Sequence, residues 1–225
     1  MLGSEIQSIP LGMNRVADMI GGSGRRSFSR RAVGLALAAA LLVPSLAQAQ
    51  FSDSYNFLKA VRDRDGAKVT EFVDQPGTTV INTRDSSSGE TALHIVVARR
   101  DPVWVNFMLA KGAKPNLTDN NGTTPLMLAA QIRFLDGARL LLTGGAQVDK
   151  ANERGETPLI RAVQLRDLAM VRLLVSNGAN PDKADTMAGM SARDYAKRDA
   201  RTPAILAALD TSKPAQGTGE IQGPK

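Results

Sequence analysis

The sequence contains no cysteine among its 225 residues. Disulfide bonds, thiolate metal sites, a cysteine nucleophile and a lipidated amino-terminal cysteine are therefore excluded. The chain has a single histidine, His94, and a lone histidine does not make a catalytic triad or a metal cluster. It also lacks a glycine-rich phosphate loop, a nucleophile elbow and any metal-binding motif. We expect no catalytic residue, no metal site and no cofactor.

Aromatic residues are scarce too, at 4% of the chain, whereas small aliphatic residues are frequent. Sheet sandwiches usually draw on aromatic and β-branched side chains, and alanine and leucine suit closely packed helices. The composition therefore favours an all-α fold.

The charge does not point to nucleic acid, although the formal net charge is +6. The first 49 residues contribute five basic and two acidic residues, which leaves 23 basic against 20 acidic residues in the rest. A balance this small gives no strong field for a polyanion. We expect no nucleic-acid partner.

Residues 25–49 have the three parts of an export signal: a basic stretch, an apolar run over 32–43 and the small-x-small triplet 47–49. Cleavage is predicted before Gln50, so residues 1–49 would be removed and the mature protein would reside in the periplasm. A spanning helix needs roughly 20 apolar residues, so we expect no permanent membrane anchor. The stretch 25–30 resembles a twin-arginine motif, and the general secretory route remains the alternative. Met13 or Met19 could be the true start.

Internal repeats organise the region after this signal. Several residue types recur at intervals of 33, some opening a segment and others closing it. Those that open it are Gly89, Gly122 and Gly155, then Thr91, Thr124 and Thr157, then Leu93, Leu126 and Leu159; those that close it are the Gly-Ala pairs at 112–113, 145–146 and 178–179. A fixed period shared by several markers indicates an array of repeats.

The openings read GETALH (89–94), GTTPLM (122–127) and GETPLI (155–160), and the closings read FMLAKGA (107–113), LLLTGGA (140–146) and RLLVSNGA (172–179). They resemble the consensus of the ankyrin-repeat family, Gly-x-Thr-Pro-Leu-His at the start of one helix and Leu-Leu-x-x-Gly-Ala at the end of the next. The resemblance implies an all-α solenoid of stacked helix-turn-helix units with short β-hairpin-like tips. We assign this domain to residues 50–209, with repeats at about 54–83, 84–116, 117–149, 150–182 and 183–209, and a disordered tail to 210–225.

The repeat spacing has a physical basis. The threonine of each opening predicts a helix N-cap, and Pro125 and Pro158 follow at the first helical position, where a missing N–H costs nothing. The glycine of each closing pair predicts a helix end in the left-handed conformation. Within the helices, small apolar residues such as Leu126, Ala129 and Ala130 are predicted to form the core.

Two single residues have competing interpretations. His94 fills the histidine position of the family motif, which favours a structural hydrogen bond over catalysis, because Met127 and Ile160 replace it in the next repeats. Trp104 lies one period before Gly137, so we expect its ring to fill the space above that glycine rather than to stand exposed as an interface anchor.

The turn between the two helices of each repeat carries arginine where the family usually has glycine. These residues are Arg64, Arg100, Arg133 and Arg166. One account is that arginine complements the carbonyl end of the first helix while a following aspartate caps the second. The other is an anion-binding ridge that grips carboxylates on a partner. Both accounts can hold together.

The resemblance also implies where a partner protein would bind, namely at the hairpin tips and on the outward face of the first helix of each repeat. The expected residues are Ser87, Ser88, Glu90, Arg99, Asn120, Asn121, Thr123, Gln131, Ile132, Glu153, Arg154, Glu156, Gln164 and Leu165. Ile132 and Leu165 are apolar at equivalent positions, which suggests an apolar centre inside a polar rim.

These features predict a non-enzymatic, monomeric scaffold that binds another protein in the periplasm. The exported bacterial ankyrin proteins that this chain resembles include ones associated with catalases and peroxide resistance, so a stress-related role is an extension by analogy. Two alternatives stay open: a secreted effector or toxin-neutralising protein, and an enzyme whose site has no recognisable motif.

Overall fold

A computed structural model describes residues 43–199 and 203–211, so the predicted export signal and tail lie mostly outside the described residues. The chain divides into two compact units, 1–46 and 47–225, and the second contains the repeats. The helices are α2 (Val43–Asp63), α3 (Gly66–Val73), the 3-10 helix η1 (Val80–Asn82), α4 (Ala92–Ala98), α5 (Pro102–Ala110), α6 (Pro125–Gln131), α7 (Leu135–Thr143), α8 (Pro158–Gln164), α9 (Leu168–Ser176), α10 (Ala192–Arg198) and α11 (Pro203–Asp210).

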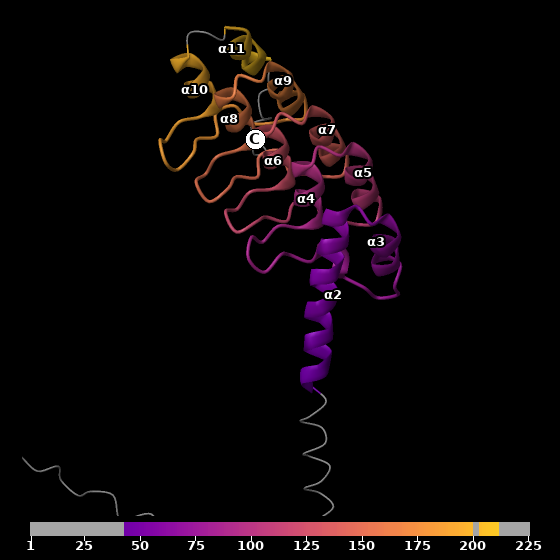
Figure 1. Cartoon of the computed structure of the whole chain (residues 1–225). Helices are drawn as coiled ribbons and strands as arrows, with labels where there is room; N and C mark the ends of the chain where they lie inside the picture. Colours follow the sequence, from indigo (N-terminus) through magenta and orange to yellow (C-terminus); the bar gives the residue numbers. More distant parts are fainter. Residues whose placement is uncertain (1–42, 200–202, 212–225) are drawn as a thin grey trace, which may run out of the picture. The chain divides into compact units, whose positions relative to one another are not determined.

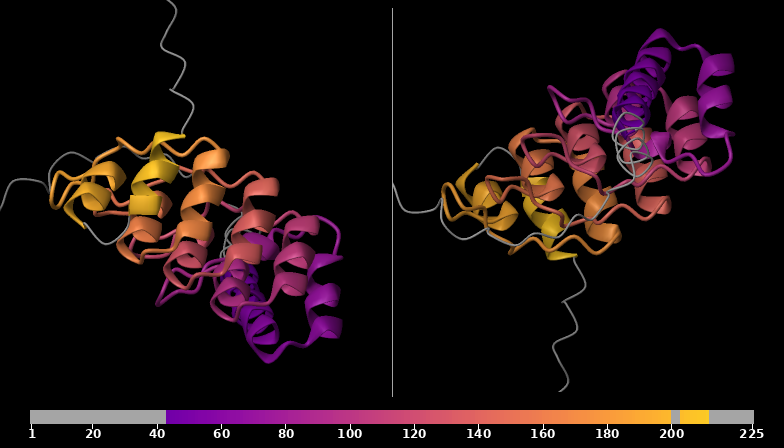
Figure 2. Two further views of the ribbon diagram at one scale, coloured as in Figure 1. Left: turned by 90° about the horizontal axis from the view of Figure 1, so that it is seen from above. Right: turned by 90° about the horizontal axis from the view of Figure 1, so that it is seen from below.

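The helices come in pairs, and we call the first member of each pair helix A and the second helix B. Helices α4, α6, α8 and α10 pack against one another in sequence order, as do α5, α7, α9 and α11. Figure 1 shows these two rows with loops projecting on one side, and Figure 2 shows the helices side by side along the stack. No β-strand occurs in residues 43–199 and 203–211, where only an isolated bridge joins Ala184 to Ser191. The predicted all-α solenoid is confirmed.

The helix ends follow the predicted chemistry. Thr124 Oγ1 accepts from the backbone N–H of Met127, and Thr157 Oγ1 accepts from that of Ile160, both at 3.2 Å. Each bond satisfies one of the N–H groups that a helix start leaves without a partner. At the other end of the repeats, Gly112, Gly145 and Gly178 all have φ of 86°. Glycine adopts this conformation without the steric cost that a Cβ would add.

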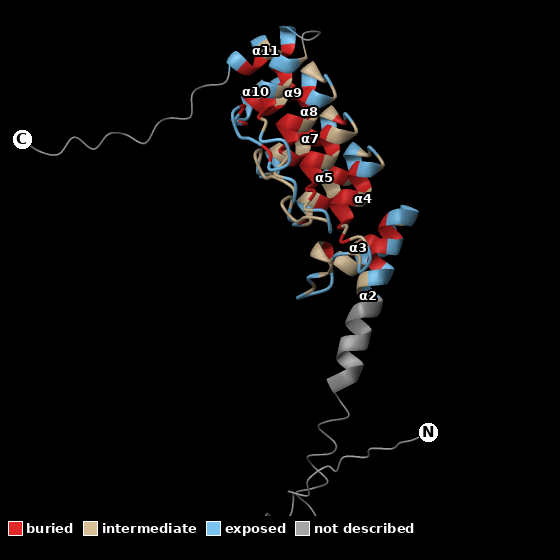
Figure 3. Cartoon of the chain, turned by 90° about the vertical axis from the view of Figure 1, so that its left-hand side faces the viewer, coloured by how far each residue is buried: buried red, intermediate tan, exposed pale blue. Residues whose placement is uncertain are grey.

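The core lies between the two rows, where Figure 3 shows a continuous band of buried residues. Helix A contributes small aliphatic side chains such as Leu126, Ala129 and Ala130, and helix B contributes Leu141 and Leu174, all fully buried. Small residues allow neighbouring helices to approach closely, so the core is shared along the stack.

The prediction that Trp104 fills the space above Gly137 is wrong, although its ring does pack against the core. A Cβ built on Gly137 would lie 2.2 Å from ring carbons of Phe134, so Phe134 occupies the space above Gly137. Trp104 is instead half-buried, in edge-to-face contact with Phe107 at 6.0 Å and with the Arg99 guanidinium 5.1 Å from its ring. Phe134 is the N-cap residue of α7 and stands three residues before Gly137, so its ring covers the glycine from within the same helix start.

Candidate protein-binding surface

The loop before each helix A forms a tip: tip 1 (85–90), tip 2 (119–123), tip 3 (152–156) and tip 4 (185–190). In tip 2 the backbone N–H of Asp119 donates to the carbonyl of Thr123 at 3.0 Å, and Asp119 Oδ1 accepts from the N–H groups of Asn121 and Thr123. An aspartate or asparagine at this place stabilises a turn by bonding to its own following backbone. The same role is taken in the other tips by Asp85, Asn152 and Asp185.

Neighbouring tips are joined to each other by backbone hydrogen bonds. Asn120 donates to the carbonyl of Ser88 at 3.0 Å, and Thr186 donates to the carbonyl of Arg154 at 2.9 Å. Between them, Glu153 donates to the carbonyl of Asn121 at 3.3 Å. The tips therefore form one connected wall along the helix A row.

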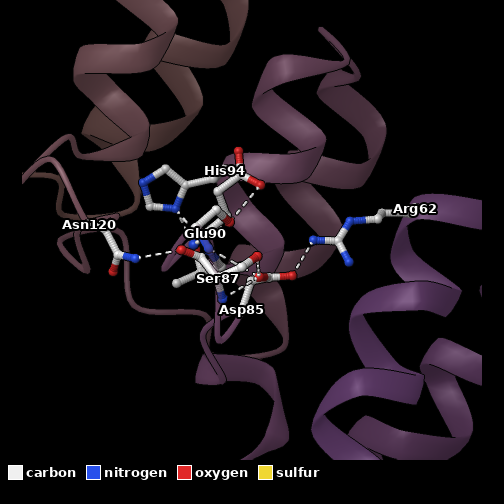
Figure 4. Close-up of polar contacts among 8 residues, drawn as sticks. Arg62, Asp85, Ser87, Glu90, His94 and Asn120 are labelled. Atoms are coloured by element: carbon white, nitrogen blue, oxygen red, sulfur yellow. Dashed lines mark hydrogen bonds and ion pairs between the residues drawn. The ribbon is translucent and has the colours of Figure 1, made fainter.

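Side-chain contacts fasten tip 1 on both sides (Figure 4). Arg62 from α2 forms an ion pair with Asp85, with 2.7 Å between Nη2 and Oδ2, and Asn120 Nδ2 donates to the carbonyl of Ser87 at 2.8 Å. Hydrogen bonds from the Ser87 hydroxyl and from Arg62 hold the pKa of Asp85 well below its usual range.

His94 ties helix α4 to tip 2. The backbone N–H of Thr91 donates to His94 Nδ1 at 3.1 Å, so Nε2 carries the proton and donates to the carbonyl of Thr123 at 3.0 Å. The residue is 1% exposed, and this burial lowers the pKa of its imidazole. The structural interpretation of His94 is confirmed.

A cleft of about 450 Å³ lies between the tips and the helix A row. Its lining is mostly polar: Glu90, His94, Asp119, Asn121, Thr123, Leu128, Gln131, Asn152, Glu153, Arg154, Glu156 and Arg161. Four carboxylates face two guanidiniums there. Arg161 lies 3.5 Å from Glu156, while Glu90, Asp119 and Glu153 form no ion pair with any described residue. The cleft therefore has an excess of unneutralised negative charge.

Comparison with known proteins supports the repeat assignment. The family model described as "Ankyrin repeats (3 copies)" matches residues 57–149 and again 93–185. The chain belongs to the ankyrin-repeat family. It is also 43% identical over 47 residues to an ankyrin repeat protein of Fowlpox virus (strain NVSL), a match that covers 21% of this chain and 14% of the viral protein. Ankyrin repeats generally mediate protein–protein interaction, and the family typically serves as a non-enzymatic scaffold.

Most of the residues predicted for partner binding at the tips of this ankyrin protein reach solvent. Ser87, Asn120, Asn121, Glu153 and Arg154 are exposed. Ser88, Glu90 and Glu156 are half-buried. Thr123 differs from the prediction, since it is only 8% exposed: its N–H donates to Asp119 and its carbonyl accepts from His94 of α4.

The predictions for helix A need more correction. Gln131 lines the cleft, and Gln164 is exposed as expected for an outward position, but it lies outside the cleft and accepts from Arg161 at 2.8 Å. The Arg99 side chain is only 15% exposed, because it donates to the carbonyl of Val61 at 2.7 Å and pairs with Asp101 at 3.5 Å.

Ile132 and Leu165 do not form the apolar centre of the cleft. Both are half-buried C-cap residues at the far end of helix A, and neither lines the cleft. The apolar side chain on the cleft floor is Leu128, which the sequence analysis missed together with Arg161. A simple signal could have found them, since each stands four residues after an N-cap threonine and therefore on one helix face.

The arginines at the turns between helices A and B, which we call the arginine ladder (Arg64, Arg100, Arg133 and Arg166), share one conformation. Their φ angles lie between 55° and 59°, and all four are exposed. Such φ values cost about 1 kcal/mol or more for a residue with a Cβ. Asp65, Asp101 and Asp167 follow in three of the turns and accept from the N–H groups of Lys68, Trp104 and Met170, as predicted for helix B caps.

Two ladder residues, Arg100 and Arg133, cap the helix A of the next repeat and not the helix that each of them ends. An Nη2–H of Arg100 donates to the carbonyl of Ile132, and Arg133 Nη2 donates to that of Leu165 at 2.5 Å. Each acceptor is the C-cap residue of the next helix A, whose carbonyl has no partner within its own helix. The capping account thus operates between repeats.

Across the described part of the chain, no three His, Asp or Glu side chains come together as a possible metal site. None of the helices within residues 43–199 and 203–211 has both the length and the apolar character that crossing a bilayer requires.

Proposed function

We propose that this ankyrin protein is an exported scaffold that holds a partner protein in the cleft between its tips and its helix A row, and that it works in a bacterial periplasm. The observation that carries the proposal is the cleft itself, which has a volume of about 450 Å³, a mostly polar lining and one side formed by the hydrogen-bonded tip wall. A surface that is already ordered loses little entropy when a partner binds.

The charge of the cleft indicates what it would accept. Glu90, Asp119 and Glu153 have no ion-pair partner among the described residues, and Leu128 provides an apolar floor. An extended partner segment with basic and aliphatic side chains complements both features. A peroxide-handling enzyme of the same compartment is the first partner to test, because the exported ankyrin proteins that this chain resembles include ones associated with catalases.

Photo-crosslinking in living cells tests the binding surface. A photoreactive amino acid replaces Asn121 at the cleft or, in the control, Arg139, which is exposed on the helix B row. We expect a discrete adduct in the periplasmic fraction from position 121 alone, weakened when Glu90 and Glu153 are changed to glutamine. Equal adducts from both positions, or none from position 121, would contradict the proposal.

Export is tested separately by the mass of the mature protein. The expected product begins at Gln50, and the paired change Arg25→Lys with Arg26→Lys should block export if the twin-arginine route is used. Intact protein in the culture medium would instead favour the secreted effector.

A further inference from the structure

The arginine ladder stands at a position where this chain elsewhere uses glycine. At the end of α4, the N–H of Arg100 donates to the carbonyl of Val97 at 2.8 Å and that of Asp101 to Val96 at 3.2 Å. The end of α5 has the same pair of bonds, from Gly112 to Leu109 and from Ala113 to Met108. This motif takes a left-handed residue, usually glycine. Every helix A with a described turn nevertheless ends in a strained arginine, so the side chain must supply something that glycine lacks.

One contribution of the arginine side chain is its hydrogen bond to a carbonyl of the next repeat, but that bond uses only part of each guanidinium. Arg100 and Arg133 each use one Nη2–H on a carbonyl, and a guanidinium has five N–H donors. Within the described residues neither side chain forms an ion pair, whereas Arg166 is neutralised by Asp199 at 2.5 Å. Arg100 and Arg133 are therefore positive charges fixed in place, exposed and unpaired.

The carboxylates near the ladder do not cancel these charges. Asp101 is turned toward the N–H of Trp104 and the side chain of Arg99. In the next repeat Phe134 replaces the capping aspartate, so no acidic residue directly follows Arg133, and Asp136 in the first turn of α7 forms no ion pair with it. The positive charge is least compensated between Arg100 and Arg133.

We propose that Arg100 and Arg133 bind carboxylates of an acidic segment of a partner protein, at the edge of the stack opposite the tips. The two residues belong to successive repeats, and neighbouring helices pack about 8–10 Å apart. An extended polyproline-type segment rises about 3.1 Å per residue with three residues per turn, so acidic side chains at every third position fall on one face about 9 Å apart. Exposed Val103 and half-buried Ile132 supply apolar contact beside the charges. This surface is separate from the cleft and attracts the opposite charge.

Fluorescence anisotropy with the full chain tests the proposal. The probe is a labelled proline-rich peptide with glutamate at every third position, and the matched peptide has glutamine there. We expect the glutamate peptide to bind at least about tenfold more tightly at low salt, and to weaken as salt rises. Arg100→Gly with Arg133→Gly should lower its affinity by about tenfold or more without lowering the melting temperature by more than a few degrees, because glycine relieves both strained φ angles.

The control is Arg139→Gln with Arg172→Gln, which removes the same charge from exposed positions on the helix B row. It should keep the affinity within about twofold of the unchanged chain. Equal loss in both double variants, no preference for glutamate, or capture by anionic vesicles but not by the peptide would overturn the proposal. Changing Glu90 and Glu153 to glutamine should leave peptide affinity undiminished, so a failure here is distinguishable from a failure of the cleft.

Discussion

His94, the single histidine of the chain, links the stability of the fold to pH. Its pKa is lowered in the folded protein by burial, whereas an unfolded chain has the ordinary value of about 6.5. As the pH falls below about 6.5, the unfolded state therefore binds a proton and the folded state does not. The free energy of unfolding decreases over this window, down to the folded pKa, by at most about 1.4 kcal/mol per pH unit.

Urea unfolding at a series of pH values measures this effect. His94→Gln should lose the pH dependence in that window, because the chain contains no other histidine. An imidazole that titrates at the ordinary pKa by NMR in the folded protein would contradict this expectation.

A second prediction at the residue scale concerns Gly137, where helix propensity and packing predict opposite effects of an alanine. Helix propensity alone would make Gly137→Ala stabilising by about 1 kcal/mol. The added Cβ would meet the Phe134 ring at 2.2 Å, so we expect a loss of about 1–3 kcal/mol instead. A double-mutant cycle with Phe134→Ala checks the cause by denaturant unfolding. The alanine at 137 should cost little once the ring is gone.

At the scale of elements, one arginine links the last helix to the rest of the stack by ion pairs. Arg193 on α10 contacts Asp182 in the preceding loop at 2.7 Å and also Asp210 at the end of α11. Exposed pairs contribute only about 1 kcal/mol or less each, so Arg193→Ala should change global stability little. Hydrogen exchange in α11 should nevertheless rise, and Arg139→Ala should leave it unchanged. Unaltered protection of α11 would show that Ile205 and Leu209 hold this helix without the arginine.

The elements are also where sequence reasoning worked best. Thr124 and Gly145 mark helix ends because capping is a local effect of a residue on its own backbone. Phe134 over Gly137 and Arg100 on Ile132 could not be predicted in this way, because a repeat period does not say which rotamer a side chain takes or which neighbouring repeat it reaches. The cleft floor is an intermediate case, since Leu128 could have been placed from the helical period.

Across the whole molecule, the position of a repeat in the stack should decide whether a core truncation destabilises the entire domain or only its end. Leu141 in α7 and Leu209 in α11 are both fully buried, and truncating either to alanine removes the same atoms. Leu141→Ala should cost about 2–5 kcal/mol of global stability, since a central repeat contacts two neighbours. Leu209→Ala should mainly fray the end of the stack, as hydrogen exchange resolved along the chain would report. Equal global losses would contradict nearest-neighbour stability in this protein.

The tips differ in length, and this breaks the symmetry of the repeats. Tips 1 and 4 close between residues five apart, from Asp85 to Glu90 and from Asp185 to Met190, whereas tips 2 and 3 close between residues four apart. The four equivalent positions on helix A are also all different: Ile95, Leu128, Arg161 and Tyr195. On a perfectly periodic stack a bound segment could slip by one repeat and find the same contacts. Here each shift by one repeat would bring different side chains into contact, so we expect a bound segment to adopt a single register.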